Sequence, residues 1–146
     1  MMPDDPHEAS RRTLTIRSEL SEIDKARAFL RESLAPCRLD EEEIFKLELA
    51  LVEICVNITR YAYPDGGGPI GLTLWIEPGI CLEIRDSGVP FDPRLLPPPD
   101  LDRLLASSRR GGLGVYLARK LVDDFDYKRE NEENIVTLSR CLPFTN

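Results

Sequence analysis

Five stretches of the chain are predicted to be strands, and in the first three apolar and polar residues alternate with a period of two, a pattern typical of strands with one buried face. The second and third stretches are separated by Pro78-Gly79, and the fourth and fifth by residues 130–134. Each of these pairs is therefore predicted to form a hairpin. The five predicted strands are Thr13–Ser18, Ile70–Glu77, Ile80–Arg85, Phe125–Arg129 and Ile135–Cys141.

Between the first two predicted strands, apolar residues recur every three or four positions, which predicts two helices. The first helix is expected to start with a capping box at Ser21 and to end before Pro36. The second is longer, and Asp40 with Glu43 three residues on is expected to cap its start. Their apolar stripes are Ile23, Ala26, Leu30 and Leu34 in the first helix, and Ile44, Leu47, Leu51, Ile54, Cys55, Ile58 and Ala62 in the second.

A long proline-rich connection runs from Asp86 to Arg110, with a short helix predicted near Leu101–Ala106. A connection of this length in a small domain is typical of a functional loop, and residues 92–111 are predicted to form a lid. A third helix is expected from about Gly112 to Val122. This order of elements predicts an α+β two-layer sandwich, with a mixed, mostly antiparallel sheet and helices on one face. Residues 13–146 are expected to form this one domain after a disordered segment at residues 1–12.

Composition narrows the classes of function. With 42% hydrophobic and 31% charged residues, the chain is ordinary globular material. A net charge of −7 argues against direct nucleic-acid binding, because phosphate contacts need a basic face. No apolar run approaches the ~20 residues of a membrane span, and Met1–Arg12 lacks the apolar core of a signal peptide. A cytoplasmic protein that binds neither nucleic acid nor membrane is therefore expected.

Cysteine and histidine chemistry is not expected at a functional site. The only histidine, His7, lies in the predicted disordered segment. The four cysteines have no C-x-x-C spacing, so we expect reduced core thiols rather than a zinc or redox site. They are Cys37, Cys55, Cys81 and Cys141.

Glu53 and Asn57 lie four residues apart on the second predicted helix and therefore share a face. This face is predicted to lie opposite the apolar stripe, and a solvated polar face is its ordinary interpretation. The alternative is chemical. The amide oxygen of Asn57 suits Mg²⁺, which keeps several waters and takes phosphate oxygens as ligands. The carboxylate of Glu53 can accept a proton from an attacking hydroxyl.

Asp86 and Gly88 follow a predicted buried strand. A carboxylate in this place can accept a hydrogen bond from the amino group of adenine, and a glycine lets the ring approach the backbone. Because Asp-Ser-Gly is also common in turns, a role limited to the turn stays open.

A glycine cluster, Gly111-Gly112-Leu113-Gly114, opens the third predicted helix. Backbone amides at a glycine-rich helix start can hold phosphate oxygens, and the helix dipole helps. Arg109 or Arg110 can add a charged contact to the terminal phosphate. The spacing is neither that of a P-loop nor that of a dinucleotide fingerprint, and a flexible lid hinge is the plain alternative.

In this order, the three segments resemble the nucleotide-binding boxes of the anti-sigma-factor serine/threonine protein kinases of bacterial partner switching. These kinases are small members of the GHKL, or histidine-kinase-like, ATPase superfamily. Glu53–Pro64 is similar to the N box, Asp86–Pro93 to the first glycine box, and Arg110–Gly114 to the second. The resemblance extends from Thr13 to Leu142 and implies the Bergerat ATP-binding fold.

The resemblance also implies a role for each residue of the boxes. Glu53 would activate the serine hydroxyl of a protein substrate, and Asn57 would ligate Mg²⁺. Asp86 and Gly88 would read the adenine of ATP. The phosphates would be held by the second glycine box, which comprises Arg110, Gly111, Gly112, Leu113 and Gly114.

By the same resemblance, the chain would be an ATP-dependent kinase that phosphorylates a STAS-domain anti-anti-sigma protein and sequesters a sigma factor. It would act as a homodimer through its first strand and helix. The sequence departs from the family at Tyr61, where histidine is usual, and at Ile135, where threonine often stands near the adenine.

Three alternatives remain. The first is a nucleotide-binding anti-sigma or switch module with little kinase activity, against which Glu53 argues. The second is a detached histidine-kinase catalytic domain, although the residues before Thr13 are not expected to form a dimerisation hairpin. The third is an α+β protein whose boxes match by accident.

Overall fold

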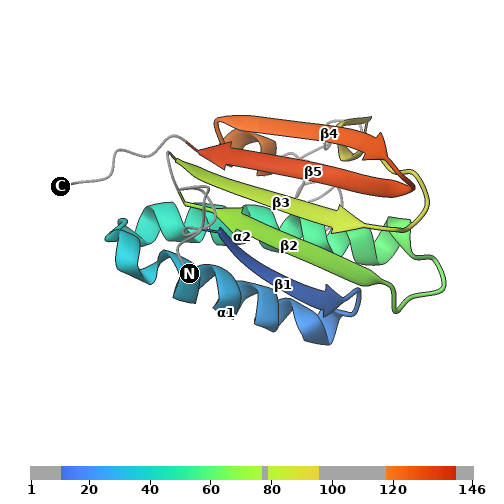
Figure 1. Cartoon of the computed structure of the whole chain (residues 1–146), viewed down its shortest axis with the longest axis horizontal. Coiled ribbons are helices and arrows are strands. Elements are labelled where there is room, and N and C mark those ends of the chain that lie inside the picture. The colour runs from blue at the N-terminus through green and yellow to red at the C-terminus, as the bar shows by residue number, and fades with distance from the viewer. Residues whose placement is uncertain (1–10, 77–78, 96–117, 141–146) are drawn as a thin grey trace, which may run out of the picture.

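The computed structural model describes residues 11–76, 79–95 and 118–140. In these ranges five strands form one sheet in the order β1-β2-β3-β5-β4 (Figure 1). All four strand pairs of the described ranges are antiparallel. The strands are β1 (Arg11–Arg17), β2 (Pro69–Trp75), β3 (Ile80–Asp86), β4 (Asp124–Glu130) and β5 (Glu133–Arg140).

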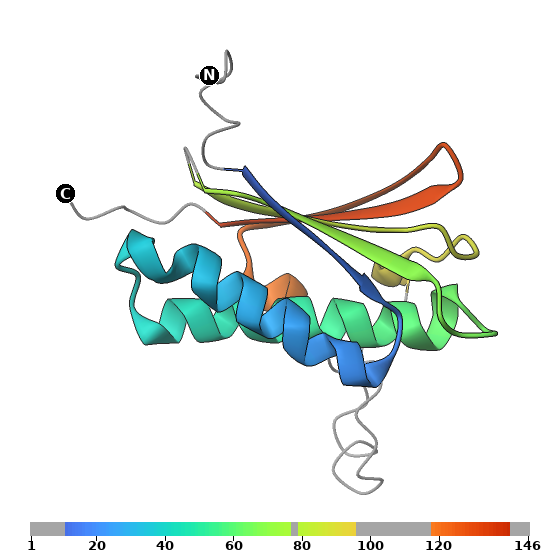
Figure 2. The ribbon, with the colours of Figure 1, turned by 60° about the horizontal axis from the view of Figure 1, so that its bottom comes forward.

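Two long helices cover one face of this sheet (Figure 2). They are α1 (Ile23–Leu34) and α2 (Glu41–Asn57), and α2 continues into a π-helical segment, Ile58–Ala62. Residues 118–121 are also helical. The predicted α+β class with helices on one face of the sheet is confirmed. The sheet was expected to be mixed and mostly antiparallel, whereas all of its described strand pairs are antiparallel.

The core lies between the helices and the sheet. Because strand side chains alternate, β3 buries Ile80, Leu82 and Ile84 and leaves the residues between them partly exposed. The predicted stripes of both helices are buried, except that Ile44 is only half-buried. The helical residues at 118–121 join the same core through Ala118.

The helix starts differ from the predicted capping boxes. A 3-10 turn, Leu20–Glu22, precedes α1, so Ser21 lies ahead of the N-cap and its predicted capping role is wrong. At α2 the N-cap position is held by Asp40, as predicted, but its side chain makes no capping hydrogen bond. The Glu43 carboxylate, however, accepts a 2.6 Å hydrogen bond from Arg140 of β5, so a tertiary ion pair takes the place of a local cap.

The hairpin of β4 and β5 is tighter than its sequence suggests. Its strands pair up to Glu130 and Glu133, and only Asn131 and Glu132 form the turn. The predicted loop at residues 130–134 is therefore wrong, because the polar Glu133 and Asn134 continue the strand although they interrupt the apolar alternation. Asn134 consequently pairs with Asp86 of β3.

Both residues of this turn have left-handed backbone conformations, with φ of 52° at Asn131 and 65° at Glu132. Asparagine tolerates this region, whereas glutamate is strained there. Glu132→Gly is expected to stabilise the chain by about 0.5–1 kcal/mol, because relief of strain outweighs the added entropy of the unfolded state. Urea unfolding measures the effect. Asn131→Gly is the matched control and should gain less; equal gains would contradict strain at Glu132.

Other boundaries shift slightly. β1 begins at Arg11, earlier than predicted, and β2 ends at Trp75, before its predicted end. Several predictions lie outside the described residues: most of the N-terminal segment, the lid beyond residue 95 with its short helix, and the start of the third helix.

Candidate functional site

The π-helical end of α2 lies against the loop that follows β3 (Figure 1). The backbone N–H of Val89 donates to the carbonyl of Ala62 at 2.8 Å, which satisfies a helix-end carbonyl. The N–H of Ser87 donates to the Tyr63 hydroxyl at 2.6 Å, and that hydroxyl donates to the carbonyl of Pro69 at 2.7 Å. The segments predicted as the N box and the first glycine box are therefore side by side.

Asn57 is the last residue of α2 and is only 4% exposed, whereas Glu53, one turn earlier, is half-buried. The expectation of a solvated face is wrong for Asn57, because its neighbours Cys55 and Ile58 are buried as well and this end of the helix is enclosed on more than one side. A single buried amide oxygen fits a Mg²⁺ ion whose other ligands are phosphate oxygens and waters. The metal and base roles of these two residues stay predictions.

Asp86 ends β3 and is 4% exposed. Its Oδ1 accepts hydrogen bonds from the N–H of Gly88 at 2.9 Å and from Nδ2 of Asn134 at 2.8 Å. Burial raises the pKa of Asp86 above its ordinary value, and the hydrogen bonds from Asn134 and Gly88 oppose that rise. With both donors on Oδ1, the second oxygen, Oδ2, can accept a further donor such as an adenine amino group.

Gly88 has a structural reason to be glycine. A Cβ atom at this position would lie 2.1 Å from the carbonyl oxygen of Ala62 and 2.6 Å from its carbonyl carbon. Glycine is therefore required here for the close approach of this loop to the backbone of the neighbouring helix. Its approach to a nucleotide ring stays a prediction.

Asn134 is a polar residue that sequence reasoning missed. It is 2% exposed, and its Nδ2 donates to Asp86 Oδ1 and to the carbonyl of Val89, both at 2.8 Å. Its Oδ1 accepts from the Tyr127 hydroxyl at 2.6 Å and from the N–H of Phe91 at 3.2 Å. One side chain thus ties the loop after β3 to both strands of the last hairpin. The sequence feature that could have indicated it is its spacing of two from the apolar Val136, which places both residues on one face of a strand.

Ile135 is not the residue of β5 that pairs with Asp86, and its implied place near the adenine stays a prediction. Ile135 pairs with Arg85 of β3, whereas its neighbour Asn134 pairs with Asp86. Side chains alternate along a strand, so only one of the two neighbours can face the helix layer. The position that meets Asp86 is Asn134.

Tyr61 joins the two segments by an aromatic contact. Its ring stacks on that of Phe91, with centroids 4.9 Å apart and planes inclined by 21°. Tyr61 remains 42% exposed. The residue that replaces the usual histidine therefore packs against the first glycine box.

The start of the predicted lid is anchored to β4. Arg94, in a single 3-10 turn (Pro93–Leu95), donates to Asp92 at 2.9 Å and lies 3.4 Å from Asp126. Its guanidinium carbon lies 5.7 Å from the centre of the Tyr127 ring. These contacts fix the first residues of the lid beside Tyr127, whose hydroxyl donates to Asn134.

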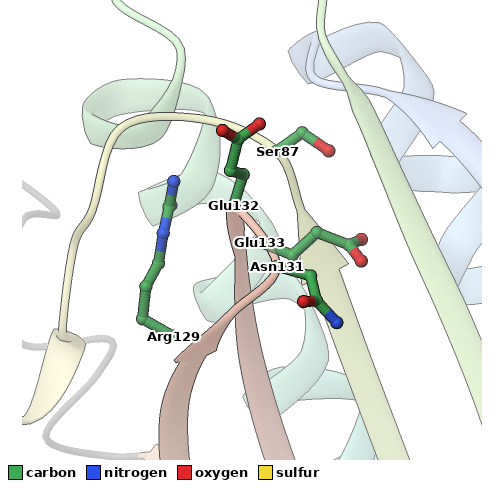
Figure 3. Close-up of a pocket in the computed structure, with 5 residues that line it drawn as sticks. All are labelled: Ser87, Arg129, Asn131, Glu132 and Glu133. Atoms are coloured by element: carbon green, nitrogen blue, oxygen red, sulfur yellow. The ribbon is translucent and has the colours of Figure 1, made fainter.

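A polar hollow lies at the β4–β5 turn, beside the loop after β3 (Figure 3). Arg129 lines this hollow and donates to the carbonyl of Gly88 at 2.8 Å. The hollow differs from the predicted nucleotide site, because its lining includes neither Glu53 nor Asp86. The lining residues are Ser87, Arg129, Asn131, Glu132 and Glu133.

The second glycine box, Arg110–Gly114, lies outside the described residues. The helix predicted to follow it is fixed at its other end by Arg140. This arginine donates from Nη1 to the carbonyl of Leu121 and from Nε to Glu43, both at 2.6 Å. β5 therefore holds the end of that helix beside the start of α2.

The family model of the histidine kinase-like ATPase domain matches residues 16–140. The chain belongs to this family. The strand end with Asp86 and the helix end with Asn57 both lie within the matched range. None of the helices in the described ranges is long and apolar enough to cross a membrane.

The chain is similar to curated serine-protein kinases RsbW. It is 31% identical to the protein of a Bacillus cereus strain over 88 residues, which are 57% of this chain and 55% of that protein. It is 30% identical to that of Halalkalibacterium halodurans over 95 residues, 62% and 58% of the two chains. The matched part is thus a little over half the length of these relatives. The predicted resemblance to anti-sigma-factor kinases is confirmed.

A solved structure shares the fold. The crystal structure of the RsbU and RsbW domains of Rv1364c from Mycobacterium tuberculosis matches with a TM-score of 0.58 and 20% identity. The match covers 89% of this chain and 32% of that one. It therefore spans nearly all of the elements described above.

Proposed function

We propose that the chain is an ATP-dependent protein serine/threonine kinase that phosphorylates a STAS-domain anti-anti-sigma protein and sequesters a sigma factor. The observation that carries the proposal is the contact of Gly88 with Ala62, which holds the loop after Asp86 against the helix of Glu53 and Asn57. The name of the RsbW relatives supports the class of reaction. The proposal includes a homodimer formed through β1 and α1.

Each residue of the site has one task in this proposal. Asp86 accepts a hydrogen bond from the adenine amino group. Asn57 holds Mg²⁺, which supplies positive charge at the phosphate oxygens. Glu53 accepts the proton of the serine hydroxyl of the partner protein. The phosphates are held by the second glycine box, Arg110, Gly111, Gly112, Leu113 and Gly114.

One observation favours a second candidate, a nucleotide-binding switch module with little kinase activity. Tyr61 stands where the related kinases usually have histidine, and its ring stacks on Phe91. A phenol in this contact does not supply the imidazole chemistry of the usual residue. Glu53 argues for the kinase, since nucleotide binding needs no base.

Incubation of the purified chain with radiolabelled ATP and the STAS-domain protein encoded nearby tests the proposal. We expect the radiolabel on a serine of the STAS-domain protein, and we expect the kinase itself to capture the sigma factor. Nucleotide binding without transfer would favour the switch module. A chain that binds no ATP would contradict both candidates.

Asn57→Ala is expected to weaken ATP binding by about ten-fold or more, because the metal loses its only proposed protein ligand. Calorimetry with and without EDTA measures the effect. EDTA should weaken binding to the wild-type chain strongly and binding to the variant only slightly. Thr59→Ala is the control, since the Thr59 hydroxyl donates to the helix carbonyl of Cys55 at 3.0 Å. If EDTA weakens ATP binding equally in the wild-type chain and in Asn57→Ala, Asn57 does not hold the metal.

A further inference from the structure

We infer that Asn134 is a positioning residue that sets the nucleobase specificity of this site by holding the Asp86 carboxylate as a hydrogen-bond acceptor. The inference rests on the proposed function, in which Asp86 reads adenine. It goes beyond that function because it assigns the choice between purines to a residue of β5 that lies in none of the three boxes. The contact that carries it is the 2.8 Å bond from Asn134 Nδ2 to Asp86 Oδ1.

The orientation of the Asn134 amide is fixed by two backbone groups, one of which can only donate a hydrogen bond and one of which can only accept one. The backbone N–H of Phe91 can only donate, so the amide oxygen must face it. The carbonyl of Val89 can only accept, so Nδ2 must face that carbonyl and, with its other proton, Asp86. A flipped amide would bring oxygen against oxygen at both Val89 and Asp86. Asn134 therefore always presents a donor to Asp86.

This donor decides what Asp86 can offer to a base. Oδ1 already accepts two hydrogen bonds, from Asn134 and Gly88, so a proton taken up by Asp86 would sit on Oδ2. Such a proton would turn Oδ2 from an acceptor into a donor. Burial favours proton uptake, and the Asn134 bond opposes it by lowering the pKa of Asp86. Asn134 thus occupies Oδ1, so Oδ2 is the oxygen left to accept from a base, and the Asn134 bond acts against proton uptake by the carboxyl.

An acceptor at Oδ2 selects one class of purine. A 6-amino group, as in adenine, donates to Oδ2, whereas the 6-oxo group of inosine or guanine would bring two acceptors together. A purine without a substituent at that carbon loses the hydrogen bond but suffers no repulsion. These three bases separate the effect of the Asp86 carboxylate from the rest of nucleotide binding.

The experiment measures the affinities of ATP, ITP and purine riboside triphosphate for the full chain near neutral pH. The wild-type chain should prefer ATP. Asn134→Ala should reduce the ratio of ATP affinity to purine riboside triphosphate affinity by about ten-fold, because a bond to a charged group is no longer held in place. Asp86→Asn should remove the preference for ATP altogether, and its ratio of affinities is the lower limit against which Asn134→Ala is compared.

Val136→Ala is the matched control. Val136 lies on the same strand and the same face, one alternation farther from Asp86, and is 4% exposed. Its truncation should lower Tm without changing the ratio of affinities. If Asn134→Ala instead weakens all three nucleotides by one common factor, Asn134 is only structural and the inference is overturned.

A second variant keeps the test valid if Asn134→Ala does not fold. Asn134→Asp retains the oxygen for Tyr127 and Phe91 but places a second carboxyl against Asp86, and two such groups share one proton. The ratio of ATP to ITP affinity should then vary with pH in the variant and stay constant in the wild type. A constant ratio in both chains overturns the inference.

The outcome also separates this inference from the proposed function. A wild-type chain that prefers ATP and loses the preference in Asp86→Asn, but keeps it in both Asn134 variants, leaves the function intact and rejects the role of Asn134. A wild-type chain that does not distinguish the three nucleotides rejects the role of Asp86, and with it the inference.

Discussion

Glu53→Gln is expected to abolish phosphorylation of the partner serine while leaving ATP affinity within a few-fold. A general base contributes about 10²–10⁴-fold to the rate, and glutamine keeps the shape of the side chain but cannot accept the proton. Glu53 lies one helical turn before the proposed metal ligand, so it should contact the incoming hydroxyl rather than the nucleotide. Transfer of radiolabel to the STAS protein measures the rate, and calorimetry measures ATP binding.

Glu42→Gln is the matched control, because it makes the same change in shape and charge on the same face of α2, about three helical turns before Glu53. Glu42 is exposed there and lies 3.7 Å from Lys46. This variant should phosphorylate at the wild-type rate. Capture of the sigma factor should survive Glu53→Gln, which would then act as a locked antagonist. If Glu53→Gln transfers phosphate at a near wild-type rate, the helix face at Glu53 is not catalytic, and the switch module becomes the better candidate.

The elements of the fold were predictable from the apolar pattern. Its periods of two and of three to four led to β3 with Ile80, Leu82 and Ile84 inward, and to the stripes of α1 and α2. What the pattern missed depends on contacts between distant residues. The capping role of Glu43 is lost because Arg140, far along the chain, claims its carboxylate.

The candidate site divides in the same way. Local motifs led to Glu53, Asn57, Asp86 and Gly88, and the structure brings their two segments together through Ala62. The sequence pattern did not indicate Asn134, because a polar residue beside a turn is expected to belong to the loop. Once the turn is shortened to two residues, strand alternation alone turns Asn134 toward Asp86 and Ile135 away.

Gly88→Ala, which adds a single methyl group, is expected to destabilise the described part of the site more than any other substitution of this size. The new Cβ would lie 2.1 Å from the carbonyl oxygen of Ala62, which is backbone and cannot move aside like a flexible side chain. The loop must shift, which breaks the bond from Val89 to Ala62 and displaces the Gly88 N–H from Asp86. We expect a loss of about 2 kcal/mol or more in the free energy of unfolding.

We expect Gly88→Ala to weaken nucleotide binding as well. A displaced Gly88 removes one of the two donors that hold Asp86 Oδ1, so ATP affinity should fall by about ten-fold. Urea unfolding and calorimetry measure the two effects. Gly71→Ala is the control, since a Cβ there would meet only the Cβ of Arg85 at 4.0 Å, an ordinary contact in β2. It should change neither quantity much. If Gly88→Ala folds as stably as Gly71→Ala and binds ATP equally well, the junction of helix and loop does not shape the nucleotide site, and the geometric basis of the proposed kinase is lost.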